Sequence, residues 1–386
     1  MQNFVLHNQT KILFGRDILA EIGRETAALG TRALLVYGMG SISRSGVLDR
    51  IRTALLDSGI EVTEHGGVRS NPILSHVRAG IAAARTRNID VVVAAGGGSV
   101  IDSAKAIAAG TLADHDVWQF FRAKKSIRCA LPVISVLTAA GSGSEMNGGM
   151  VLTNEETQQK FGIGNRLLCP RVSLLDPTLT FTVPPDQTAF GAIDAIAHSI
   201  EFSLTSRDPA TPLQDRFTAA LIATIMESCD RALQAPDDYQ ARADLMWCAT
   251  LALNGWIAAG LGRVAMPAHL IEHSLSALYN LPHGAGLAIV LPAWLRHQCR
   301  TSPDKLACLG RRLFSLADND RQAAAATIVR LADWFEQIGA PRTLTDAGID
   351  RADIPLIADN ALGQGRIWRL ADYGKEIIMA ILSDCR

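Results

Sequence analysis

The sequence predicts an α/β domain with a mainly parallel sheet, followed by an all-helical domain. In the first half, apolar runs without polar alternation end at glycine-rich turns and alternate with amphipathic stretches. This pattern is typical of strands covered by helices on both faces. After residue 183, long Ala/Leu-rich stretches with helical periodicity replace it. We therefore expect residues 1–183 to form the α/β domain and residues 184–386 to form the helical domain.

The predicted strands of the first domain are short and apolar. They lie at residues 33–37, 61–63, 91–95 and 131–137, and further β-like runs follow at 148–153, 159–164 and 172–176. Helices are expected between strands, for example over 73–87 and 100–109. Since the carboxyl ends of parallel strands meet at one edge of a sheet, the glycine-rich turns that follow three of these strands should converge there.

The second half contains long helical stretches. Asp186 follows two prolines and is a plausible N-cap for the first of them. The predicted helices span 186–204, 211–233, 239–260, 267–279, 284–299, 303–316, 321–338 and 367–382. Most of them repeat apolar residues with the helical period, which indicates that each buries one face.

Composition excludes several classes of function. The 386 residues include 37 basic and 38 acidic side chains, a formal charge of −1, so no strong field attracts nucleic acid or an anionic membrane. The seven cysteines are scattered without a Cys-x-x-Cys pair, as expected of reduced thiols in a cytoplasmic protein. The N-terminus does not resemble a secretory signal. The apolar stretch 276–295 contains prolines and a histidine that argue against a membrane span.

A glycine-rich turn is the candidate phosphate-binding element. Gly97, Gly98 and Ser99 follow a predicted strand and open a helix, where free backbone N–H groups and the helix dipole favour an anion. The turn matches neither G-x-G-x-x-G nor a P-loop. The alternative is a purely structural turn, in which Ser99 caps the helix and Asp102 completes a capping box. Two further turns, 38–41 and 141–144, favour phosphate binding because they also follow predicted strands.

Histidines and an aspartate in the helical half have the spacing of a metal site. Asp194 and His198 are four residues apart on one predicted helix, and so are His269 and His273 on another. His283 follows a proline at the start of the next helix. A carboxylate with imidazoles suits Zn²⁺ or Fe²⁺, although any single histidine here has a plain alternative as a hydrogen-bonded core residue. Spacing alone does not choose between His269 and His273.

A competing interpretation is a zinc peptidase. Residues 269–273 read H-x-x-E-H, in which both histidines would bind zinc and Glu272 would activate water. This interpretation leaves the glycine-rich turns unexplained and assigns no role to Asp194 or His198.

The chain resembles the iron-containing (group III) alcohol dehydrogenase family, and within it the butanol-dehydrogenase-like, NADPH-dependent aldehyde reductases. Residues 96–105 match the nucleotide loop of that family, and residues 269–286 match its second signature. The first signature is matched at Asp176, Pro184, Gly191, Asp194 and Glu201. The resemblance implies a dehydroquinate synthase-like architecture, with a Rossmann-like dinucleotide-binding domain before an all-helical metal-binding domain. We expect Asp176, Asp186 and Glu201 to have structural roles.

The resemblance also implies the residues of the site. The metal ligands would be Asp194, His198, His269 and His283. His273 would be the catalytic residue, as a proton relay or substrate contact. Gly97, Gly98, Ser99 and Asp102 would bind the diphosphate. Thr138, Asn147 and Lys160 would contact the ribose and nicotinamide. Gly38, Gly40, Ser41 and Asn71 would flank the adenosine end.

The implied activity is hydride transfer between a nicotinamide and a small aldehyde or primary alcohol, in a homodimer that binds Fe²⁺, with Zn²⁺ as the alternative ion. The turn after the first predicted strand, 38–44, contains no acidic residue that would repel a 2′-phosphate. Ser41 and Arg44 could donate hydrogen bonds to that phosphate, so NADP(H) is expected to be preferred over NAD(H). A polyol or sugar-phosphate dehydrogenase of the same superfamily is the other enzyme considered.

Overall fold

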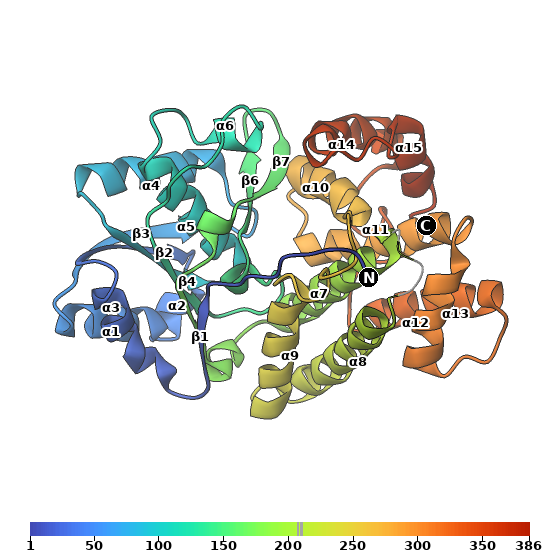
Figure 1. Ribbon diagram of the computed structural model, residues 1–386, viewed down its shortest axis with the longest axis horizontal. Helices are drawn as coiled ribbons and strands as arrows, with labels where there is room; N and C mark the ends of the chain where they lie inside the picture. The colour runs from blue at the N-terminus through green and yellow to red at the C-terminus, as the bar shows by residue number, and fades with distance from the viewer. Residues whose placement is uncertain (207, 209–210) are drawn as a thin grey trace. The chain divides into compact units, whose positions relative to one another are not determined.

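The computed structural model describes residues 1–206, 208 and 211–386, which form two compact units (Figure 1). The α/β unit comprises His7–Val183 and Pro236–Met246. The helical unit comprises Met1–Leu6, Pro184–Ala235 and Trp247–Arg386. Within the described residues, no helix has both the length and the apolar character needed to cross a membrane.

A six-stranded parallel sheet is the centre of the α/β unit, which confirms the predicted fold class. Its order is β1-β8-β5-β4-β2-β3, and every pairing within it is parallel. The strands are β1 (Lys11–Phe14), β2 (Arg32–Gly38), β3 (Glu61–Val68), β4 (Val91–Gly96), β5 (Val133–Leu137) and β8 (Val172–Leu175). The chain leaves β2 toward one side of the sheet and continues from β4 toward the other, so the topological switch point lies between β2 and β4.

Helices cover both faces of this sheet, as Figure 1 shows. On one face, α1 (Ile22–Ala27) and α3 (Val47–Asp57) contribute to an apolar core with the side chains of β2 and β4. The other face carries α4 (Leu74–Thr86) and α5 (Gly98–Thr111), which contact each other. Two short helices, α2 (Ser41–Arg44) and α6 (Trp118–Phe121), complete the set. A separate antiparallel hairpin forms from β6 (Gly149–Asn154) and β7 (Gln159–Gly164).

The helical unit is organised around α7 (Pro185–Thr205), whose residues from 192 to 204 are all buried. Contacts join α7 to α8, α10 and α11, and α10 also packs against α14. The remaining helices of the chain are α8 (Pro212–Gln234), α9 (Tyr239–Ala252), α10 (Pro267–Tyr279), α11 (His283–Cys299), α12 (Pro303–Phe314), α13 (Asp320–Gln337), α14 (Ile354–Trp368) and α15 (Lys375–Ser383).

Several predicted boundaries are wrong for identifiable reasons. The helix predicted over 239–260 ends at Ala252, and Gly255 and Gly260 in the rest of the predicted range adopt positive φ angles. The single helix predicted over 367–382 is the end of α14 and all of α15, separated where Arg369 takes the left-handed conformation. Asp186 is not an N-cap: Pro184 occupies that position and Asp186 lies in the first turn. The edge strand β1 was not predicted, since four partly exposed residues give little pattern.

Candidate functional site

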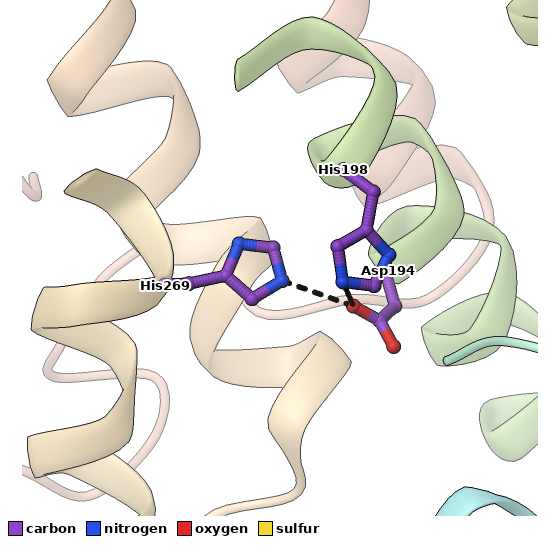
Figure 2. Close-up of side chains that lie close together, drawn as sticks. All are labelled: Asp194, His198 and His269. Carbon is purple, nitrogen blue, oxygen red and sulfur yellow. Dashed lines mark hydrogen bonds and ion pairs between the residues drawn. The ribbon is translucent and has the colours of Figure 1, made fainter. Parts of the chain in front are cut away.

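Three imidazole nitrogens converge on one carboxylate oxygen in the helical unit. The Nε2 atoms of His198, His269 and His283 lie 3.5, 3.3 and 3.6 Å from Oδ1 of Asp194. Figure 2 shows His198 and Asp194 on one helix and the ring of His269 approaching from another. The structure thus brings together the four residues that the resemblance implies as ligands.

Local packing explains how three helices approach this point. Asp194 and His198 occupy successive turns of α7, so both side chains face α10 and α11. Gly284 permits α11 to begin beside α7, because a Cβ atom there would lie 2.2 Å from the carbonyl oxygen of Phe190. His283 is the first residue of α11 and the most open member of the group, with a side chain 27% exposed.

Two buried glutamates contact the far nitrogens of these rings. Nδ1 of His269 is hydrogen-bonded to Glu201, and Nδ1 of His283 is hydrogen-bonded to Glu272. Glu201 also accepts hydrogen bonds from the backbone of α10, as a structural role predicts, but its imidazole contact was not anticipated. Histidines that bind metals usually donate their second N–H to a carboxylate in this way.

Electrostatics in this group hold Asp194 ionised, His198 neutral and His269 protonated. Burial alone would raise the pKa of Asp194, but His198, His283 and His269 outweigh burial and hold that pKa below its ordinary value. Burial is the main reason that the pKa of His198 falls to about 3, so its ring is neutral. Burial also opposes the charged form of His269, but Glu201 and Asp194 raise its pKa to about 10.

The donor set fits a divalent transition metal. One ionised carboxylate and three imidazole Nε2 atoms are ligands that both Fe²⁺ and Zn²⁺ accept. Nδ1 of His198 has no hydrogen-bond partner among the described residues. The contact of its Nε2 with Asp194 and its stacking on His269 therefore orient this ring. Two carboxylates hold a proton on His269, and the same negative charge would attract a metal cation at Nε2.

The two histidines of α10 have different neighbours. His269 faces Asp194, whereas the His273 ring lies 5.6 Å from the His283 ring and 5.4 Å from the Trp368 ring, centre to centre. His273 is 3% exposed. His273 therefore lies next to the four converging residues, on the side of His283.

The zinc-peptidase interpretation is wrong. Its general base would have to face a water molecule, but Glu272 is completely buried and accepts hydrogen bonds from Ser276 and His283. The two histidines of the H-x-x-E-H motif also diverge, since His269 is directed at Asp194 and His273 at Trp368.

The glycine-rich turns of the α/β unit meet at the carboxyl edge of its sheet. Gly38 at the end of β2 pairs with Val68 at the end of β3. Just beyond that pair, the Ser99 hydroxyl donates to the Ser70 carbonyl. A Cβ atom on Gly98 would lie 2.0 Å from Oγ of Ser142, so the turns after β4 and β5 are in direct contact. This edge flanks the topological switch point.

The capping-box alternative for the first of these turns is wrong. Helix α5 begins at Gly98 with Gly97 as its N-cap, and no side chain caps it. Asp102 is instead hydrogen-bonded to Ser144 Oγ at 2.6 Å and to the Val151 N–H at 2.9 Å. Burial raises the pKa of Asp102, against the opposing effects of Lys105 and these hydrogen bonds.

Lys105 is a structural residue that sequence reasoning missed. It is completely buried, and its Nζ donates to the carbonyls of Ser144, Asn147 and Gly149 at 2.7, 2.9 and 2.7 Å. Burial lowers its pKa to about 8. The available signal was a lysine three residues after Asp102 in the mainly apolar run 100–109. Together with Asp102, it ties residues 144–151 to α5.

The other candidate cofactor residues lie in the same unit. Nζ of Lys160 is 3.1 Å from Oδ1 of Asn71, and both residues are buried. Thr138 follows β5, and its N–H donates to the Gly96 carbonyl. The Asn147 amide donates to the Gly143 carbonyl at 2.7 Å.

The turn after β2 has a basic residue beside it. A Cβ atom on Gly40 would lie 3.1 Å from a guanidinium nitrogen of Arg44. Ser41 is exposed at the start of α2.

Comparisons with known proteins agree over the whole chain. The model for "Iron-containing alcohol dehydrogenase" matches residues 9–177, and the model for the C-terminal part of that family matches residues 188–385. The probable NADH-dependent butanol dehydrogenase 1 of Bacillus subtilis is 40% identical over 387 residues, covering 99% of each chain. The NADPH-dependent aldehyde reductase YqhD of Escherichia coli is 36% identical over 361 residues, covering 92% of each. The structure of NADH-dependent butanol dehydrogenase A from Thermotoga maritima superimposes with a TM-score of 0.95 at 40% identity, over 100% of this chain and 99% of that one.

Proposed function

Because the chain belongs to the iron-containing alcohol dehydrogenase family, we propose which of its residues bind the dinucleotide and the metal of an NAD(P)H-linked alcohol dehydrogenase and aldehyde reductase. Residues 1–183 bind the dinucleotide, and residues 184–386 bind the metal. The enzyme is an oxidoreductase that acts on CH–OH donors. The observation that carries the proposal is the convergence of three imidazole nitrogens on the Asp194 carboxylate.

Asp194, His198, His269 and His283 are the proposed metal ligands, for Fe²⁺ with Zn²⁺ as the alternative. When bound, the ion supplies a Lewis acid for a carbonyl or alcohol oxygen, and the nicotinamide supplies or accepts the hydride. The protein contributes an Asp194 carboxylate that the neighbouring histidines keep ionised and a His198 ring that burial keeps neutral.

His273 is the proposed proton-transfer residue. Its ring is buried beside His283, the most open of the proposed ligands, and it packs against Trp368, which restricts its orientation. A histidine in this position suits exchange of a proton with the substrate oxygen near neutral pH.

The proposed dinucleotide site follows the carboxyl edge of the sheet. Its diphosphate end consists of Gly97, Gly98 and Ser99, where the uncapped start of α5 offers N–H groups to an anion. Asp102 belongs to this end as the residue that holds the segment 144–151. Thr138, Asn147 and Lys160 contact the ribose and nicotinamide. Gly38, Gly40 and Ser41 flank the adenosine. Asn71 is hydrogen-bonded to Lys160, so we assign it to the same part of the site as that residue and not to the adenosine end.

NADP(H) is the preferred cofactor in this proposal. The turn after β2 lacks an acidic residue, and the Arg44 guanidinium lies against Gly40. Arg69 is exposed directly after Val68, the residue that pairs with Gly38, and adds positive charge at the same edge. Relatives named for NADH and for NADPH both occur, so the preference depends on such local residues.

The cofactor preference is tested by kcat/KM with NADPH and with NADH. We expect a higher value with NADPH, and we expect Ser41→Asp to reverse the order because its carboxylate repels a 2′-phosphate. Equal values for the unaltered enzyme, or a preference for NADH, would contradict this part of the proposal.

The proposed substrates are small aldehydes and primary alcohols, in line with relatives named butanol dehydrogenase and aldehyde reductase. Assays with a panel of alkanals, diols and sugar phosphates would distinguish these from the substrates of a polyol or sugar-phosphate dehydrogenase.

We further propose a cytoplasmic homodimer. β1 is an edge strand of the sheet, with Phe14 41% exposed, and light scattering on the purified enzyme would measure the assembly.

The metal assignment is tested with His198→Ala. Losing one of four donor atoms should abolish metal retention and turnover, while the affinity for NADP(H) stays within a few-fold. Metal content is measured by mass spectrometry alongside the rate at 340 nm. A variant that retains most of its activity without metal would overturn the assignment.

A further inference from the structure

We propose that Glu201 and Glu272 are positioning residues that select the metal-binding tautomers of His269 and His283, with Glu201 the stronger determinant. The inference rests on the proposed metal site and goes beyond it, because neither glutamate is a ligand. Both side chains are completely buried, and each is hydrogen-bonded to the imidazole nitrogen that faces away from Asp194.

The tautomer matters because a neutral imidazole carries one N–H and one lone pair. An ionised carboxylate only accepts hydrogen bonds, so a glutamate at Nδ1 requires the proton there and leaves the lone pair at Nε2. Asp194 favours the opposite tautomer of His269, since an Nε2 proton would point at its Oδ1, 3.3 Å away. In that arrangement the donor atom for a metal is lost. By accepting a hydrogen bond from Nδ1, Glu201 disfavours the tautomer in which Nε2 carries the only proton.

Glu201 is held in place by hydrogen-bond donors that cannot reverse. Its Oε1 accepts from the backbone N–H groups of Ala268 and His269, at 2.6 and 3.3 Å, and its Oε2 is hydrogen-bonded to Nδ1 of His269. Thus two carboxylate oxygens receive three N–H groups. Because backbone N–H groups are obligatory donors, Oε1 must remain an acceptor.

Glu272 is held differently. Its Oε1 lies 2.5 Å from the Ser276 hydroxyl, and its Oε2 is hydrogen-bonded to Nδ1 of His283. A Cβ atom on Gly286 would lie 2.7 Å from Cγ of Glu272, so the glycine leaves room for the carboxylate to reach its partner. A hydroxyl can either donate or accept, so the Ser276 contact adapts when its partner changes.

This difference predicts unequal effects of the same substitution. In Glu201→Gln, one amide end must be NH₂, and it faces either the backbone donors or Nδ1. If the NH₂ faces Nδ1, every polar group has a partner when His269 carries its proton on Nε2. The protein then stays folded, but a metal can bind only after that proton leaves Nε2. In Glu272→Gln, the NH₂ can face Ser276, whose hydroxyl turns to accept, and the amide oxygen still accepts from Nδ1 of His283.

The experiment compares Co²⁺ affinity in the metal-free enzyme, the two variants and the control Glu25→Gln. Glu25 is a buried glutamate that is hydrogen-bonded to Lys11, not to an imidazole. Affinity is measured by competition with a chromophoric chelator, together with the visible spectrum of bound Co²⁺. We expect Glu201→Gln to weaken binding about 10–100-fold, Glu272→Gln to weaken it clearly less, and the control to match the unaltered enzyme.

A second readout identifies the tautomer directly. In metal-free protein labelled with ¹⁵N-histidine, Glu201→Gln should leave one imidazole with a proton on Nε2 and none on Nδ1, whereas Glu272→Gln should not. Equal losses of affinity in both variants would show that only the removed charge matters and would overturn the inference, as would unchanged affinity in Glu201→Gln. If the unaltered enzyme fails to bind Co²⁺, the metal site itself is refuted. If Glu201→Gln does not fold, Glu272→Gln still tests the inference. An Nε2 proton on His283 in that variant, or a 10-fold loss of its Co²⁺ affinity, would show that the Ser276 contact does not adapt and would overturn the inference.

Discussion

Adding one methyl group at Gly98 tests the contact between two of the glycine-rich turns. A Cβ atom there would lie 2.0 Å from Oγ and 2.7 Å from Cβ of Ser142. The Ser142 hydroxyl can rotate away from the new methyl group, but the Ser142 Cβ cannot. Since relaxed carbon contacts are about 3.5 Å or longer, the turns must separate by roughly 0.8 Å. Gly98 has no positive φ angle, so the cost is steric and not conformational. Overpacking of this kind lowers the free energy of unfolding by about 1–3 kcal/mol.

The assay is urea unfolding of Gly98→Ala, Ser142→Gly and the double variant. Removing the Ser142 side chain opens the space that the new methyl group needs, so the double variant should recover most of the lost free energy. Ser142→Gly alone should cost little, because its hydroxyl accepts only a 3.3 Å hydrogen bond from the Ser144 N–H. Gly97→Ala is the matched control: its Cβ would lie 3.2 Å from Cβ of Ala139, a contact that a small shift relieves.

Measuring NADPH binding in the same four proteins separates packing from function. The double variant should regain stability but not NADPH affinity, because the methyl group remains at the start of α5, where the diphosphate must approach the backbone. Unchanged stability in Gly98→Ala, or no recovery in the double variant, would refute the steric reasoning. Full recovery of affinity in the double variant would show that the diphosphate does not need a glycine here.

Three other substitutions have predictable outcomes. Lys105→Met leaves three carbonyls without their donor; at about 1–3 kcal/mol for each unsatisfied group, we expect a loss of roughly 3 kcal/mol or more in urea unfolding, and a higher KM for NADPH. The hydrogen bond from Lys11 holds the pKa of Glu25 below its ordinary 4.5, although burial opposes it. That contribution to stability is present above the ordinary pKa and disappears as the pH falls through the folded-state pKa. The advantage of the unaltered enzyme over Glu25→Gln should therefore be seen in urea midpoints at pH 7 and vanish at pH 2. His273→Asn should reduce kcat at least about 100-fold with unchanged metal content, and an unchanged kcat would remove His273 from the proposed proton transfer.

Local patterns in the sequence were enough to predict the fold class. Apolar runs of four to six residues in β4 and β5 identify strands buried on both faces, and each ends at a glycine-rich turn. The four-residue spacing of Asp194 and His198 likewise places both on one face of α7. Each of these conclusions depends on residues within a few positions of one another.

Which distant residues meet depends on how the helices pack. His269 and His273 have equivalent spacing, and the packing of α10 between α7 and α14 directs the first toward Asp194 and the second toward Trp368. Glu201 contacts His269 across 68 positions, and Lys105 holds carbonyls 39 to 44 positions away. A buried charge needs a partner, but the residues next to it in the sequence do not indicate where that partner lies. The approach of distant helices selects the partner, because their packing decides which polar groups can satisfy one another.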